Sequence, residues 1–486
     1  MRTQAADHPR VIQGGMGVGV SGWQLARAVS QAGQLGVVSG IALDQVYARQ
    51  LQLGDPGGHV RRAFASFPRQ HVVERALARY FVEGGKPADR PFVALPMRAV
   101  QMAPEVLELL ILANFAEVFL AKEGHSGQVG INYLYKIQMP LLASLYGAML
   151  GGVDYVLVGA GSPAPVPEIL TRLARHDDVT LDLHVFYASA DQRFSSELSP
   201  RALMGNDPPP VKRPQMLAIV SSVDLATALA SGPAEPPDGF VIEGPTAGGH
   251  NAPPRGPRSL DAQGQPIYGP RDEVDLEAFR RLGRPFWLAG SYGSAAQLKR
   301  ALEIGAVGIQ VGTAFALCRE SGLDPQLKAR LLEEVRSGGL CVFTDPRASP
   351  SGFPFKVVQL AGTLGDSAVF AARPKMCDVG ELRMPYVTPQ GGLGYSCPAE
   401  SEKVYQLKGG RPQNTEGRMC LCNGLLATIG LGQHRSSGYD EPPLVTGGDA
   451  LSDVARFMPQ GETTYSAADV LESILGVRPE TVDAHE

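Results

Sequence analysis

A length of 486 residues allows one large core and an appendage. With 44% hydrophobic and 19% charged residues, the composition is that of a globular protein and not that of a disordered or fibrous chain. Its formal net charge of −5 comes without a long basic run, which argues against a nucleic-acid-binding protein. No run of 18 apolar residues occurs and residues 1–10 are polar, so we expect no membrane span and no secretion signal, and a soluble cytoplasmic protein.

Short apolar runs alternate with longer amphipathic stretches from residue 11 to about residue 317. The first unit is a strand over 11–13, a helix over 23–32 that begins after Ser21, and a strand over 36–39. Six more runs complete a set of eight strands: 131–135, 155–158, 216–220, 239–242, 285–289 and 307–311. This alternation predicts an α/β fold, a (β/α)8 TIM barrel, with an insertion and a C-terminal extension.

Other segments do not fit a simple barrel. Three of them have strand-like patterns and compete for places in it: 92–95, 117–121 and 181–187. We interpret residues 41–130 as an insertion. Two stretches rich in Pro and Gly, 189–214 and 251–271, are predicted to be long surface loops.

The pattern changes after residue 316. A helix is predicted over 325–337, followed by an irregular tract and a closing helix over 467–475. The sequence therefore predicts a barrel domain over 1–340 and an irregular C-terminal extension over 341–486.

Three glycine-rich clusters follow predicted strands. They are Gln13-Gly14-Gly15-Met16-Gly17, then Gly248-Gly249-His250, and finally the pair Ala289-Gly290-Ser291-Tyr292-Gly293 and Gln310-Val311-Gly312-Thr313. A tight turn or close helix packing would explain any one of them. Together they favour a ligand site, because glycine lets a flat ligand or a phosphate approach the backbone and because barrel enzymes build their sites at the carboxyl ends of strands. The third cluster predicts a phosphate site bound by backbone amides.

His250 lies just beyond a predicted strand. An imidazole can remove a proton near neutral pH, so His250 is the candidate catalytic base. The alternative, a histidine that is hydrogen-bonded to loop backbone, stays open.

With these clusters in this order, residues 11–321 resemble the nitronate monooxygenase family, formerly called 2-nitropropane dioxygenases. Members open with Gln, two small residues and Met, as in Gln13 to Met16, carry Gly-Gly-His, as in Gly248 to His250, and end with Gly-x-Gln-x-Gly-Thr-x-Phe, as in Gly308 to Phe315. The resemblance implies oxidation of nitronates or nitroalkanes with dioxygen and His250 as base. It also implies FMN as cofactor, held by Gln13, Gly14, Gly15, Met16, Asn132, Gly244, Gly248, Gly249, Ala289, Gly290, Ser291, Gln310, Gly312 and Thr313.

Two positions depart from the family pattern. Glu243 precedes Gly244 where members have Gln, which is reminiscent of FMN-dependent enoyl-acyl carrier protein reductases, and Ser291 replaces a usual glycine. The alternatives are therefore an NAD(P)H-dependent enoyl or quinone reductase and a non-catalytic flavin-binding scaffold. Whether the chain forms a homodimer stays open.

Four cysteines gather in the C-terminal extension, outside the resemblance: Cys377, Cys397, Cys420 and Cys422. Four thiolates can hold zinc or an iron–sulfur cluster, but their spacing matches no standard pattern, and free cysteines are often simply buried. Cys318 and Cys341 are interpreted as core thiols.

Some further residues have weaker signals. His125 is interpreted as a surface loop residue and His184 as the polar side of a strand. The loop 251–271 is a candidate lid over the site, and Lys122, Lys136 and Arg255 are candidate partners of an anion.

Overall fold

Eight parallel strands close into a barrel. The computed structural model describes residues 8–205, 207–257 and 259–477, so most of the polar N-terminus considered above lies outside the described residues. Around the barrel the strands follow the order β1-β10-β9-β8-β7-β4-β3-β2. They are β1 (Val11–Gln13), β2 (Leu35–Ser39), β3 (Val129–Leu134), β4 (Tyr155–Gly159), β7 (Gln215–Val220), β8 (Gly239–Glu243), β9 (Phe286–Ala289) and β10 (Gly308–Val311). The predicted TIM barrel is confirmed.

The inside of the barrel is filled by side chains. Ile12, Val37, Leu157 and Val241 pack there with Trp287, whose side chain is fully buried and whose indole N–H donates to the Pro9 carbonyl at 2.8 Å. A packed interior leaves space for a ligand only at a rim.

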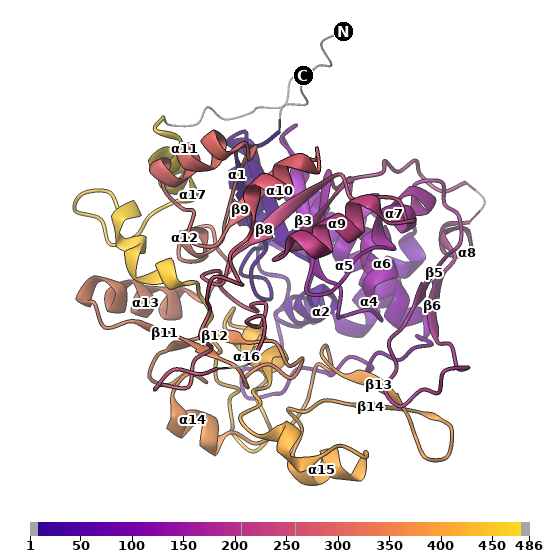
Figure 1. Cartoon of the computed structure of the whole chain (residues 1–486). Coiled ribbons are helices and arrows are strands. Elements are labelled where there is room, and N and C mark those ends of the chain that lie inside the picture. Colours follow the sequence, from indigo (N-terminus) through magenta and orange to yellow (C-terminus); the bar gives the residue numbers. More distant parts are fainter. Residues whose placement is uncertain (1–7, 206, 258, 478–486) are drawn as a thin grey trace.

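Helices surround the barrel (Figure 1). The long α5 is buried along most of its length. It packs on α6 and on the three other helices between β2 and β3, which are α2, α3 and α4. The helices up to residue 337, with the 3-10 helix η1 (Pro56–Gly58), are α1 (Trp23–Gln31), α2 (Leu43–Gln52), α3 (His59–Ala65), α4 (Gln70–Tyr80), α5 (Pro104–Lys122), α6 (Leu141–Leu150), α7 (Val166–Leu173), α8 (Pro200–Met204), α9 (Val223–Ser231), α10 (Leu276–Arg281), α11 (Ala295–Ile304), α12 (Thr313–Ala316) and α13 (Pro325–Ser337).

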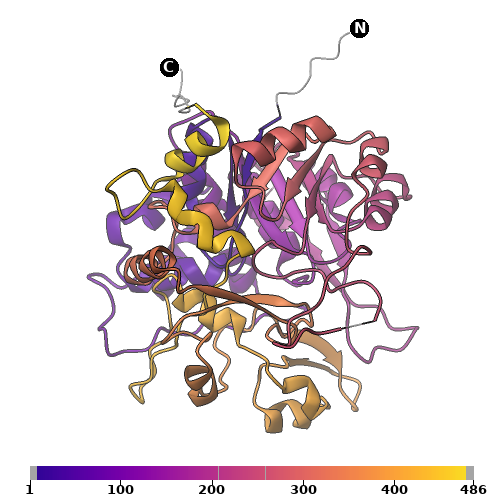
Figure 2. The same ribbon diagram turned by 60° about the vertical axis from the view of Figure 1, so that its left-hand side comes forward.

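The C-terminal extension packs directly on the barrel. Figures 1 and 2 show its orange elements beneath the barrel and its yellow end along one side. It contains the antiparallel pairs β11 (Cys341–Asp345) with β12 (Phe355–Gln359) and β13 (Met384–Val387) with β14 (Leu393–Ser396), and also α14 (Ser367–Ala372), α15 (Glu402–Leu407), η2 (Pro412–Thr415), α16 (Leu421–Ala427), η3 (Asp449–Phe457) and α17 (Ala467–Leu475). Side chains of η3 and α17 join the main hydrophobic core of the barrel.

A buried ion cluster also fastens the extension. Arg98 donates to Asp44 of α2 at 2.5 Å and to Glu381 of the extension, and all three side chains are buried. The cluster joins the segment between β2 and β3 to the extension.

Several local predictions were wrong. Residues 92–95 form no strand, and residues 117–121 lie inside α5, where continuous burial hides the helical period. Residues 181–187 overlap β5 (Val179–Asp182), which pairs with β6 (Ser195–Leu198) outside the barrel, so the predicted loop 189–214 contains β6 and α8. The helices predicted over 325–337 and 467–475 are confirmed.

Three single residues also differ from expectation. His125 is buried, with Nε2 2.7 Å from the Ala121 carbonyl, and Cys341 is exposed rather than a core thiol. His184 lies beyond the end of β5. No helix among the described residues is long and apolar enough to span a bilayer.

Candidate active site

A cavity of about 560 Å³ opens at the carboxyl ends of the strands, between the barrel and the extension. Of the residues predicted to bind the cofactor or act as base, Gly14, Gly15, Met16, Asn132, Gly248, Gly249, His250, Ala289, Gly290, Ser291, Gln310, Gly312 and Thr313 line it. Gln13 and Gly244 are not among the residues that line it, and their contacts with the cofactor stay a prediction. The structure therefore brings together residues that are far apart in the sequence.

Gln13 shapes the turn after β1. Its fully buried amide donates to the Gly14 carbonyl at 2.6 Å and to Ser21 Oγ at 2.9 Å. Ser21, which was expected to cap α1, donates to the Gly14 carbonyl and accepts from the Met16 N–H, both at 3.0 Å, while Gly22 is the N-cap. Both polar side chains thus fix the glycine turn that faces the cavity.

Glycine is required where chain segments meet at this rim. A Cβ on Gly15 would lie 2.5 Å from Asn132 Cβ, and a Cβ on Gly248 would lie 2.8 Å from the Gly448 nitrogen. Gly290 has φ +94°, and a Cβ there would lie 2.9 Å from Thr246 Oγ1. At these three positions only backbone can face the cavity, which allows a flat ring or a phosphate to approach closely.

Two buried acceptors in the cavity wall have no partner. Gln310 Oε1 and Asn251 Oδ1 each lack a hydrogen bond among the described residues, and both side chains line the cavity. Since unpaired buried oxygens are rare in folded proteins, they indicate a ligand that donates hydrogen bonds. A flavin ring has donor and acceptor groups along its edge, so these residues fit it.

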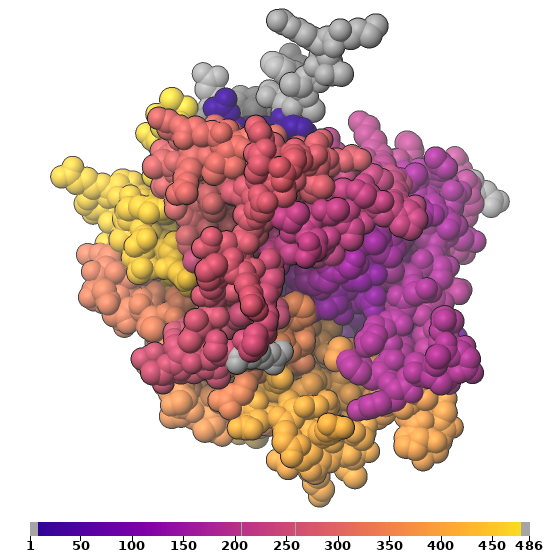
Figure 3. All heavy atoms as spheres, in the orientation of Figure 1, coloured from indigo at the N-terminus to yellow at the C-terminus, as the bar shows by residue number. Residues whose placement is uncertain are grey.

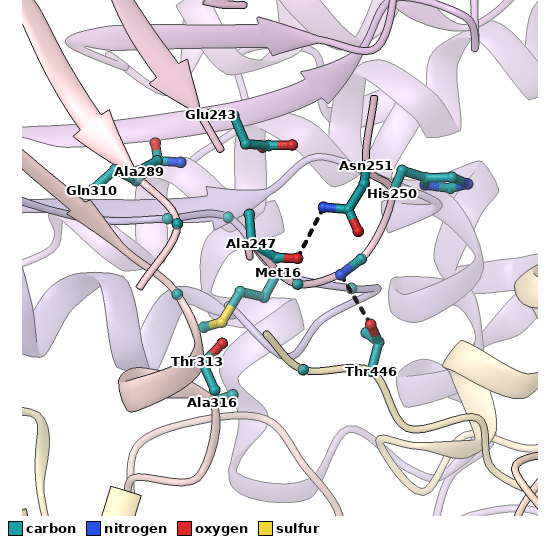
Figure 4. Close-up of a pocket in the computed structure, with 18 of the residues that line it drawn as sticks. Met16, Glu243, Ala247, His250, Asn251, Ala289, Gln310, Thr313, Ala316 and Thr446 are labelled. Atoms are coloured by element: carbon teal, nitrogen blue, oxygen red, sulfur yellow. Dashed lines mark hydrogen bonds between the residues drawn. The ribbon is translucent and has the colours of Figure 1, made fainter. Parts of the chain in front are cut away.

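His250 is held by the extension. Its Nε2 lies 2.6 Å from Ser349 Oγ, Ser349 Oγ lies 2.8 Å from Ser351 Oγ, and Lys136 Nζ donates to Ser351 Oγ at 2.9 Å. Figure 4 shows the ring at the edge of the cavity, turned away from Met16. Burial, and then the nearby Lys136 charge, lowers the pKa of His250 well below its ordinary value, so the imidazole is neutral at neutral pH.

The charges of Lys136 and Glu243 influence each other. Burial lowers the pKa of Lys136 to about 7, partly offset by the Glu243 charge. Burial raises the pKa of Glu243 to about 7, partly offset by Lys136. Glu243 lines the cavity and can therefore hold or release a proton near neutral pH. Of the other candidate anion partners, Arg255 lines the cavity, whereas Lys122 does not and instead pairs with Asp154 at 2.5 Å.

The extension supplies contacts that the sequence did not predict. The Gly249 N–H donates to Thr446 Oγ1 at 3.0 Å (Figure 4), and the Gly448 N–H donates to Thr313 Oγ1 at 2.9 Å. Residues 446–448 thus join the loop after β8 to the loop after β10. No pattern in this irregular tract could have assigned it to the site, because the contacts are made by backbone and short side chains.

The loop 251–271 has no helix or strand among its described residues. It runs from the rim towards the extension, as Figure 3 shows, and Gln265 Oε1 accepts from the Thr344 N–H at 2.9 Å. Asn251, Ala252, Pro253 and Arg255 line the cavity. The loop is placed to cover part of the site, and its role as a lid stays a prediction.

The four cysteines of the extension line one small cavity of their own. Among the residues that the structure describes, however, no group of three or more His, Cys, Asp or Glu side chains is arranged to hold a metal ion. Burial raises the pKa of Cys420 to about 12 and also raises the pKa values of Cys377, Cys397 and Cys422, which keeps the thiols neutral. Zinc or iron–sulfur ligation therefore stays a prediction that this arrangement does not support.

Comparison with protein families gives a match to the model described as nitronate monooxygenase over residues 211–341. This segment is similar to that family. It contains β7 to β10, half of the barrel, together with His250 and the loops after β9 and β10. The matched segment therefore holds much of the cavity wall, whereas Gly14, Asn132 and most of the extension lie outside it.

One curated relative is similar to a short part of the chain. A probable nitronate monooxygenase from Bacillus subtilis (strain 168) is 35% identical over 96 residues, 20% of this chain and 26% of that protein, so the match spans about a quarter of the relative.

Solved structures with a similar course of the chain include nitroalkane oxidase from Streptomyces ansochromogenes (19% identity, TM-score 0.44, 96% of this chain and 95% of that one). A second is FabK from Thermotoga maritima (16% identity, TM-score 0.43, 97% of this chain and 92% of that one). A third is the enoyl reductase domain of MlnA from Bacillus amyloliquefaciens (12% identity, TM-score 0.45, 97% of this chain and 93% of that one). These likenesses are too weak to add to the assignment.

Proposed function

We propose that the protein is a cytoplasmic FMN-dependent oxidoreductase that oxidises nitronates or nitroalkanes with dioxygen, with His250 as the base. The observation that carries the proposal is the cavity in which glycine backbone, two unpartnered acceptors and a neutral histidine meet at the carboxyl rim. The family match over the adjoining half of the barrel supports the same chemistry.

Different parts of the cavity wall would bind the ring and the phosphate of FMN. When bound, FMN supplies electron acceptance from the substrate and transfer of those electrons to dioxygen. Gly14, Gly15 and Met16 border one side of the ring site, and Gln310 and Asn251 offer acceptors to it. The amides after β9 and β10 hold the phosphate.

The base works at its free nitrogen. If the Nε2–H of His250 donates to Ser349 Oγ, the Nδ1 lone pair stays available to take the α-proton of a neutral nitroalkane. A nitronate, which has already lost this proton, does not need the base.

Glu243 favours a second candidate function, an NAD(P)H-dependent reductase of enoyl thioesters or quinones. A carboxyl group with a pKa near 7 in the cavity can donate the proton that reduction of such a substrate needs.

An anaerobic spectrum distinguishes these functions. Propyl nitronate and NADPH are added to separate samples of the purified yellow protein, and the flavin absorbance is followed. Bleaching by the nitronate alone is the expected result, and bleaching by NADPH alone would establish the reductase instead. A protein that stays colourless with added FMN, or binds FMN that neither compound bleaches, contradicts both catalytic functions.

The role of His250 is tested separately. His250→Asn is expected to keep FMN and to slow the oxidation of neutral nitroethane by about 10²-fold or more, while the nitronate reacts at nearly the normal rate. Equal slowing of both substrates would remove the base from the mechanism.

A further inference from the structure

The extension places one arginine at the edge of the cavity beside the loop after β9. Arg456 lies in η3, and its Nη2 donates to the Gly293 carbonyl at 2.7 Å. Its guanidinium carbon lies 4.8 Å from the centre of the Phe457 ring, and both side chains line the cavity. Arg456 is therefore fixed by the barrel on one side and by its own helix on the other, although it belongs to neither predicted phosphate loop.

The loop that it touches has the chemistry of an anion site. Gly290 and Ser291 both have a left-handed backbone conformation, with φ values of +94° and +56°. This conformation is uncommon for a serine. The backbone N–H groups of Ser291, Tyr292 and Gly293 have no acceptor among the described residues. Successive free amides in such a turn form a concave donor surface for an anion.

Amides provide only partial charges, whereas a phosphate monoester carries about −1.5 to −2 at neutral pH. Five side chains with titratable or charged groups line the cavity among the described residues: Glu243, His250, Arg255, Tyr292 and Arg456. His250 is neutral. The Arg255 guanidinium donates to the carbonyl of Ser221, directly after β7, and to that of Arg271 in its own loop. Arg456 is thus the cation beside the loop after β9.

We propose that Arg456 binds the phosphate of FMN, so that the extension makes the site prefer the phosphorylated cofactor over riboflavin. This inference rests on the proposed flavin function. A guanidinium has five N–H donors, and the bond to Gly293 uses one of them, which leaves others to pair with phosphate oxygens.

Titration with two flavins tests the proposal. Protein freed of flavin is titrated with FMN and with riboflavin, which has the same ring but no phosphate, and binding is followed by quenching of flavin fluorescence. In Arg456→Met, FMN binding is expected to weaken by roughly 10- to 100-fold, the value of a charge-assisted pair, and riboflavin binding to change by less than about threefold. Added salt should weaken FMN binding in the wild type more than in the variant.

Two variants serve as controls. Arg456→Lys keeps the charge and should restore part of the preference for FMN. Arg319→Met removes an arginine that bonds Thr464 of the extension but does not line the cavity, and it should leave the ratio of the two affinities unchanged.

The outcomes distinguish the role of Arg456 from flavin binding itself. Equal weakening of FMN and riboflavin in Arg456→Met would mean that Arg456 only fastens η3 to the barrel, which overturns this inference and leaves flavin binding intact. If the wild type binds neither flavin, the proposed function fails and this inference fails with it.

Discussion

His250 Nε2 lies 2.6 Å from the hydroxyl of Ser349, a residue of the C-terminal extension 99 positions later in the chain. The ring that the barrel provides is thus oriented by a side chain from outside the barrel. Because the hydrogen bond at one imidazole nitrogen determines the state of the other, Ser349 controls whether His250 can act as a base.

Replacing Ser349 tests this dependence. Ser349→Ala is expected to slow the oxidation of a neutral nitroalkane by about 10-fold or more, because the ring loses its partner, and to leave oxidation of the nitronate almost unchanged. Steady-state rates with nitroethane and ethyl nitronate measure the effect. Ser452→Ala, at an exposed position of η3, is the control. Unchanged rates with nitroethane would show that the hydrogen bond is dispensable.

Lys136 should influence the pH at which the base works. Burial is the larger cause of the lowered pKa of His250, and the Lys136 charge is the second. Since Lys136 is charged mainly below its pKa of about 7, Lys136→Met is expected to raise the pKa of His250. Activity with nitroethane is lost as pH falls through the pKa of the base, so the acidic limb of the kcat/KM profile should move to higher pH. An unmoved limb would contradict this coupling.

The turn after β1 should tolerate no side chain. Gly15→Ala places a methyl group 2.5 Å from Asn132 Cβ, so we expect a loss of FMN binding by at least about 10-fold through displacement of the turn. Gly269→Ala is a matched control, because a Cβ at Gly269 meets nothing within 4 Å. Flavin content after purification and the fluorescence titration measure both variants. Normal flavin binding by Gly15→Ala would place the ring elsewhere.

The buried ion cluster should matter for stability. Arg98→Met leaves Asp44 and Glu381 buried without their cation, and we expect a loss of about 3–5 kcal/mol in the free energy of unfolding. Arg62→Met, which removes an exposed pair with Glu123, should cost about 1 kcal/mol or less. Urea unfolding measures both. Because burial raises the pKa of Glu381, the Arg98→Met deficit should shrink at acidic pH, where this carboxylate takes up a proton, and a deficit that does not depend on pH would contradict this explanation.

The four clustered cysteines should behave as packed thiols. Because burial keeps them protonated, we expect Cys377, Cys397, Cys420 and Cys422 to resist alkylation by iodoacetamide in the folded protein and to react in urea. Exposed Cys341 should react first and serves as the internal control. Stoichiometric zinc or iron in the purified protein, lost in Cys420→Ser, would contradict this and establish the metal site instead.

The sequence predicted all eight barrel strands, because each is a short apolar run with a glycine or proline nearby. It also predicted the rim residues from Gly14 to Thr313, since glycines at strand ends have few other uses when they recur. It failed where burial was continuous, as in α5, whose apolar residues lie on every side and leave no helical period. Ser21 was misassigned because a serine before a helix is usually a cap, and here its hydroxyl serves the preceding turn.

The contributions of the extension could not be predicted for a different reason. Ser349, Thr446 and Arg456 act through single contacts with residues more than 90 positions away, and neither periodicity nor spacing encodes such contacts. Gln13 shows the converse, because the motif that contains it is visible in the sequence whereas its hydrogen bonds to Gly14 and Ser21 are not.

The chain has two tryptophans, Trp23 and Trp287, and both belong to the barrel, while residues 341–486 contain none. Trp287 is enclosed among the strands, where its emission should be blue-shifted and should move to the red only when the barrel opens. A variant that detaches the extension but spares the strands would therefore lose helical circular dichroism before its emission maximum moves. The molecule thus has its own optical probe for one of its two parts.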